Sequence, residues 1–257
     1  MDELFEGIVS NTTSGASETY MKILNHIILG NLKDPDLPEA LMRSAGDMVP
    51  LCYVSRRLSQ EPVFRWKDTA GDLQREIRQQ GVEAGIQLYK QLQDSGNMIL
   101  CHSRSGSVLK ALEHRKNRLD TVYQTVARPG EEGRSAAETL IQNGFKVELI
   151  EDDAFPAALS KGAVPVMGAD AVTEEFLVNK IGSLAMIKAA LEAQITPIIL
   201  AGKEKLIQRS IYGDRPRGSQ FERIPLTGLK VIVGPQTFSI PKHSAKLAAL
   251  IGSQETC

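Results

Sequence analysis

This chain of 257 residues has few aromatic residues and no excess of basic over acidic residues. Aromatic residues make up 5%, and 30 Lys+Arg against 31 Asp+Glu leave a formal net charge of −1. Without a basic excess to neutralise phosphates, we expect no nucleic-acid partner. No stretch approaches the roughly 20 apolar residues that span a bilayer, so we expect no membrane partner. The acidic start lacks the layout of a secretory signal, and we expect a cytoplasmic protein.

The few cysteines and histidines form no metal-binding pattern. Cys52, Cys101 and Cys257 include no CxxC pair, and the four histidines are scattered. Zinc sites need closely spaced ligands and disulfide frameworks need paired cysteines, so we expect neither. A GxGxxG turn is missing after the first expected strand, which argues against a dinucleotide. We therefore expect no metal and no cofactor.

Residues 1–92 predict a helical N-terminal domain. Glu18–Leu29 and Asp72–Leu92 carry apolar residues at spacings of three and four, which place one apolar stripe on each helix. Shorter helices are expected around Leu41-Met42 and Val49–Val54, where Pro50 limits how far a helix can continue.

Residues 93–257 predict a Rossmann-like α/β domain. Short runs that are apolar throughout indicate strands buried on both faces, and their alternation with helices is typical of a parallel, helix-covered sheet. The expected strands are Met98–Cys101, Thr121–Val126, Lys146–Ile150, Val164–Met167, Ile195–Leu200 and Leu229–Val233. The expected helices are Ser107–Arg115, Arg134–Asn143, Asn179–Ala193 and Pro241–Ile251.

The segments that follow these strands carry the candidate site residues, because ligands of open α/β sheets bind outside the carboxyl ends of the strands. Arg104, Ser105 and Gly106 lead into a helix and could hold an anion at its start. Alternatively, Ser105 or Ser107 merely caps that helix.

Arg128 stands in a second such segment, Arg128–Arg134, and could bind a phosphate or a carboxylate with two parallel hydrogen bonds. The alternative is a turn in which Arg128 pairs with Glu131 or Glu132.

In a third segment, Asp170 follows a buried strand, where a carboxylate can act as a general base or accept a sugar hydroxyl.

Asn179 and Lys180 are expected to open the next helix near Asp170 and to offer a neutral donor and a positive charge. The alternative is that Asp170 caps a turn and Lys180 forms a salt bridge with it. If the site exists as expected, Asp170 and Arg128 face one shared cavity.

The order of these segments resembles one superfamily. It contains the alpha, beta and delta regulatory subunits of translation initiation factor 2B, methylthioribose-1-phosphate isomerase and ribose-1,5-bisphosphate isomerase. The resemblance covers about residues 95–251. The segments that carry it are Met98–Ser103, Arg128-Pro129 with Gly133, Gly168-Ala169-Asp170, Asn179-Lys180-Ile181-Gly182-Ser183, Lys205 and Phe238-Ser239-Ile240-Pro241.

The resemblance implies a choice between catalysis and binding. The isomerases open a phosphorylated ribose and move a proton between C1 and C2 with a cysteine and an aspartate. Asp170 matches the aspartate, but the cysteine position falls on Ser103, and a hydroxyl is a poor proton shuttle near neutral pH. This serine resembles the factor 2B subunits, which usually lack the aspartate. Cys101, two residues earlier, and His102 are alternative acid/base groups, although His102 is expected to face the domain interface.

The leading hypothesis is a factor 2B-related protein that binds a sugar phosphate or nucleoside monophosphate. The alternatives are an aldose–ketose isomerase of a phosphorylated pentose, with Asp170 as acid/base and Ser103 or Cys101 in the relay, and an assembly subunit with a vestigial pocket. The resemblance also implies a homodimer. The expected ligand-binding residues are Arg104, Ser105, Gly106, Arg128, Gly133, Asn179, Lys180 and Lys205.

Overall fold

The structure is a computed structural model that describes residues 3–9, 16–45, 49–93, 97–113, 119–213, 218–241 and 244–253. Its N-terminal part is helical, as the sequence predicts. The helices are α1 (Glu3–Val9), α2 (Ala16–Ile28), α3 (Leu37–Ser44), α4 (Val49–Ser59) and α5 (Trp66–Leu92), with the 3-10 turn η1 (Val63–Arg65) before α5. Pro50 lies in the first turn of α4, where its missing N–H would have no partner in any case.

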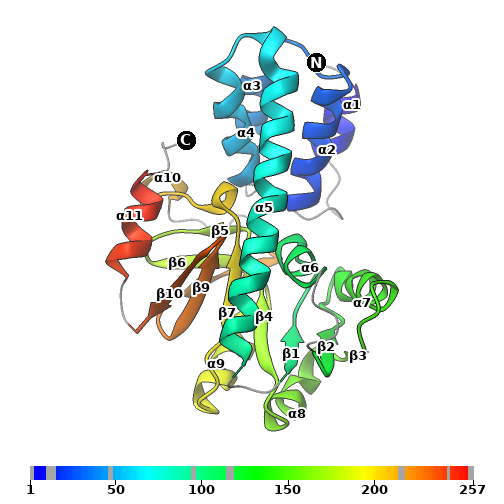
Figure 1. The fold of residues 1–257 in the computed structure, drawn as a ribbon, viewed down its shortest axis with the longest axis vertical. Helices are drawn as coiled ribbons and strands as arrows, with labels where there is room; N and C mark the ends of the chain where they lie inside the picture. The colour runs from blue at the N-terminus through cyan, green and yellow to red at the C-terminus, as the bar shows by residue number, and fades with distance from the viewer. Residues whose placement is uncertain are drawn as a thin grey trace.

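Helix α5 runs from this helical part down along the sheet (Figure 1). Its first half, including Trp66 and Leu73, packs in the core formed with the other N-terminal helices. Its second half, including Leu88 and Leu92, packs on the sheet. Because one helix belongs to both cores, the boundary expected between residues 92 and 93 stays a prediction.

The second part is built on a seven-stranded sheet in the order β10-β9-β7-β4-β1-β2-β3. All neighbouring strands are parallel except β10, which pairs antiparallel with β9. The expected α/β fold class is therefore confirmed. The strands are β1 (Met98–Cys101), β2 (Thr121–Thr125), β3 (Val147–Ile150), β4 (Val164–Met167), β7 (Ile198–Ala201), β9 (Leu229–Val233) and β10 (Gln236–Ile240).

Helices cover both faces of this sheet, which explains why its strands are apolar throughout. In β1, Ile99 and Cys101 pack with α5 and α6, whereas Leu100 packs with α8 and α9 on the opposite face. The helices are α6 (Gly106–Leu112), α7 (Glu132–Gln142), α8 (Phe155–Ser160), α9 (Ser183–Glu192), α10 (Arg209–Tyr212) and α11 (Ala245–Ser253), with the 3-10 turns η3 (Asp152–Ala154) and η4 (Lys203–Lys205). Across the described ranges, no helix is long and apolar enough to cross a bilayer.

A second, three-stranded sheet corrects one prediction. It contains β5 (Ala171–Val172), β6 (Phe176–Lys180) and β8 (Phe221–Pro225), in the order β5-β6-β8. The expected helix from Asn179 is wrong at its start: Asn179 and Lys180 end β6, which pairs antiparallel with both neighbours. The helix begins only at Ser183, after Gly182 adopts φ 97°.

His102 joins the main sheet to the turn between β6 and α9. Its Nε2 donates to the carbonyl of Ile181 (2.8 Å), so in the neutral ring Nδ1 accepts from the hydroxyl of Thr125 (2.7 Å). Burial lowers the pKa of His102 below its usual 6.5. The ring therefore faces β2 and this turn, not the helical part as expected, and its contacts are those of a neutral structural group.

We predict that His102→Ala lowers the free energy of unfolding by about 2–4 kcal/mol at pH 7.5, because it leaves two buried polar groups without a partner. Chemical denaturation measures the change. His26→Ala is the matched control, since among the described residues the ring of His26 hydrogen-bonds only the exposed side chain of Asn31, and it should change stability by less than about 0.5 kcal/mol.

The same pair of variants reports on pH. A lowered pKa in the fold means that the stability contributed by neutral His102 is present above the unfolded pKa of 6.5 and is lost as the pH falls. The difference between wild type and His102→Ala should therefore shrink below about pH 6.5. Equal effects of the two alanine variants, or a difference that grows in acid, would contradict this role.

Candidate functional site

The main sheet has its topological switch point between β1 and β4. From β1 the chain adds β2 and β3 on one side and then returns to place β4 on the other side of β1. Ligands of such sheets usually bind in a crevice beside the loops that follow the strands at the switch point, which here are the loops after β1 and β4. Gly168, directly after β4, lies against the β1–α6 loop: a Cβ on Gly168 would be 2.0 Å from Ser105 Oγ. Only a glycine allows this approach.

Asp170 follows Gly168 at this crevice. Its backbone N–H donates to the carbonyl of Val178 (2.8 Å), which fixes it beside β6. Among the described residues, none donates a hydrogen bond to its carboxylate. Desolvation raises the pKa of Asp170, while the positive charges of Lys205 and then Lys180 oppose that rise. A partly buried carboxyl with a raised pKa is suited to take up and release a proton.

Lys180 approaches Asp170 from the end of β6 and is 3% exposed. Its Nζ donates to Oε1 of Glu132 (2.8 Å) and to Oε1 of Gln220 (2.9 Å). Glu132 begins α7, and a Cβ on the next residue, Gly133, would be 1.8 Å from the carbonyl oxygen of Thr125. The Gly133 position therefore lets α7 start against β2, which brings Glu132 to Lys180.

Lys205 is the second buried lysine beside Asp170, at 3% exposed. It ends η4, the turn that follows β7, so it reaches the crevice from a different strand than Lys180 does. Of the charges that act on Asp170, Lys205 has the largest effect. No described residue forms an ion pair or a hydrogen bond with its ammonium group, which leaves that group available to a ligand.

The polar side chains of the β1–α6 loop have structural contacts, and its arginine is already paired. Ser105 is the N-cap of α6 and accepts from the N–H of Val108 (3.3 Å), so the capping interpretation is correct for this residue. Arg104 pairs with Glu18 of α2 at 3.2 Å, which ties the loop to the helical part. Gly106 also lies close to α2, since a Cβ on Gly106 would be 3.0 Å from the Cβ of Ser17.

Ser103 occupies the left-handed region of backbone conformation, with φ 60°. The side chain of buried Gln124 donates to its carbonyl (3.1 Å) and so braces a conformation that non-glycine residues rarely adopt. Cys101 lies in the core between the sheet, α5 and α6, and burial raises the pKa of its thiol to about 12. This placement argues against the expected role of Cys101 in a proton relay.

Asn179 is buried, and its amide holds the turn after β6. Its Nδ2 donates to Oγ of Ser183 (2.9 Å), and that hydroxyl donates to the carbonyl of Lys180 (2.7 Å). The contacts of Asn179 therefore position Lys180 and do not by themselves indicate a ligand.

Arg128 is not where the sequence analysis expects it. Its guanidinium pairs with Glu151 and with Glu131 (3.5 Å for the latter), and its side chain is 48% exposed. The backbone N–H groups of Ala127 and Arg128 both donate to Asp152 (2.6 and 2.7 Å). Arg128 is absent from the charges that act on Asp170. Neither residue lines the cavity beside α5 and α6, and the alternative that Arg128 pairs with nearby carboxylates is the one observed.

Three residues of this site were not singled out as site residues by the sequence. Glu132 was considered only as a partner for Arg128, although it binds Lys180. Gln124 and Gln220 carry no sequence signal, because each acts through a contact between segments far apart in the chain.

Solved structures with a similar fold agree with this architecture. The translation initiation factor eIF-2B of Pyrococcus horikoshii OT3 aligns with a TM-score of 0.74 and 24% identity, over 93% of this chain and 96% of that one. The 5-methylthioribose 1-phosphate isomerase of the same organism aligns with a TM-score of 0.67 and 17% identity, over 98% and 87%. At these identities the likeness shows the fold.

Sequence comparison gives the family. A translation initiation factor eIF-2B subunit 2-like protein of Pyrococcus furiosus is 28% identical over 57% of this chain, and a ribose 1,5-bisphosphate isomerase of Archaeoglobus fulgidus is 27% identical over 68%. The matched region spans 61% of the first relative's length and 53% of the second's. A family model matches residues 55–215, more than half of the chain, and the protein therefore belongs to the Initiation factor 2 subunit family.

Proposed function

We propose that this chain binds a small phosphorylated sugar or a nucleoside monophosphate at the crevice between the carboxyl ends of β1 and β4. The observation that carries the proposal is the presence of two buried lysines, Lys180 and Lys205, beside the partly buried Asp170. Asp170 accepts a sugar hydroxyl, and the lysines hold the phosphate. That relatives include a ribose 1,5-bisphosphate isomerase supports a ligand of this class.

The two lysines contribute differently. Lys180 is already neutralised by Glu132 and bound by Gln220, so its position is fixed before a ligand arrives. Lys205 has no such partner among the described residues, and a buried ammonium without a counter-ion loses hydration that nothing in the protein replaces. A phosphate oxygen would compensate for that loss, so we assign Lys205 the main phosphate contact.

A second candidate function is aldose–ketose isomerisation of a phosphorylated pentose. The raised pKa of Asp170 favours it, because a carboxyl group poised closer to neutral pH is a better acid and base. In this reaction the C2 proton is removed and the bond between C1 and the ring oxygen breaks while the ring oxygen takes up a proton, which leaves an enol. The proton taken from C2 is then returned to C1, and the C2 hydroxyl loses its own proton to become the ketone, which restores the group that protonated the ring oxygen. Asp170 performs the C2–C1 transfer. Ser103, or water beside it, donates to the ring oxygen, which is the weak step because a hydroxyl gives up a proton less readily than a thiol.

A third possibility is an assembly subunit whose crevice is vestigial, and the homodimer expected from the sequence stays a prediction. The assembly interpretation makes no use of the unpartnered Lys205. It is therefore distinguished from the other two by ligand binding alone.

We predict that ribose 1,5-bisphosphate, methylthioribose 1-phosphate, AMP or GMP raises the melting temperature in a thermal-shift panel. A ligand at 100 times its dissociation constant adds about 2.7 kcal/mol to the free energy of unfolding, which raises the melting temperature by roughly 5–10 °C for a chain of this size.

Lys205→Met should weaken binding about 10- to 100-fold and reduce the thermal shift to less than half of the wild-type value. The matched control is Lys203→Met in the same turn, since Lys203 is 41% exposed and pairs with Glu76; its shift should equal that of wild type. Finding no shift with the whole panel would favour the assembly subunit.

We predict for the isomerase alternative that a ketose assay detects slow turnover of the ligand that binds, and that Asp170→Asn reduces it at least about 100-fold with little change in binding. Ser103→Cys should raise turnover, because a thiol with a pKa near 8.5 donates a proton far more readily than a hydroxyl. Binding without turnover, in wild type and in Ser103→Cys alike, would leave the chain a binding protein. Turnover that survives in Asp170→Asn would contradict the role given to Asp170.

A further inference from the structure

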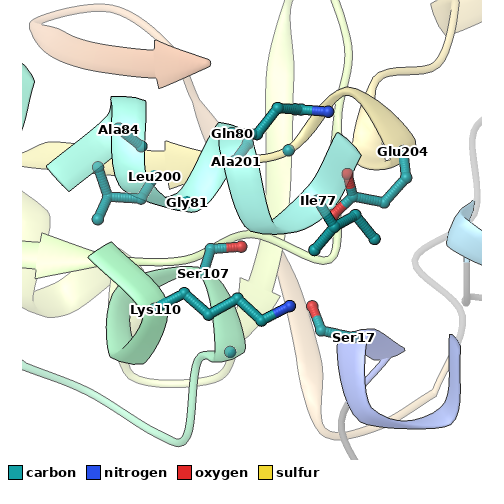
Figure 2. A pocket seen from close by; sticks show the side chains of 12 residues that line it. Ser17, Ile77, Gln80, Gly81, Ala84, Ser107, Lys110, Leu200, Ala201 and Glu204 are labelled. Carbon is teal, nitrogen blue, oxygen red and sulfur yellow. The ribbon is translucent and has the colours of Figure 1, made fainter. Parts of the chain in front are cut away.

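A cavity opens between α5, α6 and the segment at the end of β7 (Figure 2). Its empty volume is about 440 Å³, including the part open to solvent. Asp170, Lys180 and Lys205 do not line it, and the β1–α6 loop contributes only Gly106 from the earlier candidates. Its polar side chains are Ser17, Gln80, Ser107, Lys110 and Glu204.

Glu204 presents a buried acceptor without a partner to this cavity. The residue is 5% exposed, and no described residue donates a hydrogen bond to its Oε2 atom. Gly202 makes room for the carboxylate, since a Cβ there would be 2.1 Å from that oxygen. Desolvation raises the pKa of Glu204, and neighbouring Lys205 opposes the rise. A charged group in this position is costly to the fold unless something binds it.

Lys110 presents the opposite charge from α6. Its aliphatic stem lies across Gly81 of α5, where a Cβ would be only 3.1 Å from the Cβ of Lys110. Desolvation lowers the pKa of Lys110, and Glu204 is the largest charge opposing that shift. Within the described residues its ammonium group has no ion pair, and in Figure 2 it points toward the hydroxyl of Ser17.

The remaining polar side chains divide into a brace and two hydroxyls. Gln80 accepts from the backbone N–H of Lys203 (2.8 Å) and donates toward Glu76 (3.4 Å), so it holds η4 against α5. The hydroxyls of Ser17 and Ser107 lie on the side of the cavity occupied by Lys110 (Figure 2). One side thus carries donors and a positive charge, and the other carries a carboxylate.

We propose that this cavity binds a small zwitterion with the chemistry of an α-amino acid. The ligand's ammonium group binds Glu204, and its carboxylate binds Lys110 and the hydroxyls of Ser17 and Ser107. A zwitterion compensates both unpaired charges at once. A phosphate would meet the carboxylate of Glu204, a simple cation would meet Lys110, and a neutral polyol would leave both charges without a counter-ion. The residues are separate from those of the phosphate site, so the inference does not rest on the proposed function.

The test is a calorimetric and thermal-shift screen of the wild-type chain with each of the twenty α-amino acids at 10 mM. Four further compounds each carry one kind of group: sodium acetate a carboxylate, methylammonium an ammonium group, inorganic phosphate a phosphate, and ribose neutral hydroxyls. We expect at least one amino acid to bind and the four single probes to bind at least tenfold more weakly. Glu204→Gln and Lys110→Met should each weaken amino-acid binding at least tenfold, whereas Lys203→Met leaves it unchanged.

Circular dichroism checks that each variant is folded, and Ser107→Ala, a change at the cavity wall, gives a milder variant that should still weaken binding severalfold. The proposal is overturned if no amino acid binds, if ribose or phosphate binds in preference, or if the cavity variants bind as wild type does. Asp170→Asn separates the two sites: amino-acid binding that disappears in this variant and persists in Glu204→Gln would place the ligand at the phosphate site and overturn the assignment.

Discussion

The site depends on charges that are buried at the carboxyl edge of the sheet and only partly neutralised by each other. Lys180 has Glu132 as a partner, but the side chains of Asp170 and Lys205 have no hydrogen-bond or ion-pair partner among the described residues. Burying charged groups in this way works against folding, and a protein stable only by a few kcal/mol tolerates it where the rest of the structure compensates. Here the compensation comes from helices on both faces of the sheet and from α5, which packs in the helical core and on the sheet.

Glycines set the close approaches that bring these charges together. Gly133 lets α7 begin against β2 and carries Glu132 to Lys180, and Gly168 lets the loops after β1 and β4 touch. Gly202 makes room for the carboxylate of Glu204. Glu204 and Lys205 are consecutive in η4. This short turn therefore places a negative charge at the cavity between α5 and α6 and a positive charge near Asp170. A displacement of the turn would move both charges.

The sequence predicted the main sheet well and the placement of polar side chains poorly, for physical reasons. Strands buried on both faces leave apolar runs such as Val164–Met167 that stand out in any sequence. Strand β6 was not predicted, because its apolar residues Phe176–Val178 are followed directly by a helical pattern. Only the pairing with β5 and β8 makes Asn179 and Lys180 extended. Arg128 was misplaced because a long side chain at the edge of a sheet can turn either way, and nearby carboxylates, including Glu151 from the next strand, decided its direction. The position of Asp170 close after β4 could be predicted because it depends on topology alone.

The separation between binding and catalysis follows from where each group originates. The lysines proposed to hold the phosphate come from β6 and η4, whereas Ser103 belongs to the β1–α6 loop and is held through its backbone by Gln124. Exchanging a thiol for a hydroxyl at that position changes no contact of Lys180, Lys205 or Asp170 given by the structure. Under the proposed function, a chain could therefore lack the group that protonates the ring oxygen and keep all the residues proposed to hold the phosphate. In this proposal serine at residue 103 limits proton transfer and leaves the proposed ligand contacts unchanged, which is why we propose binding rather than turnover as the function.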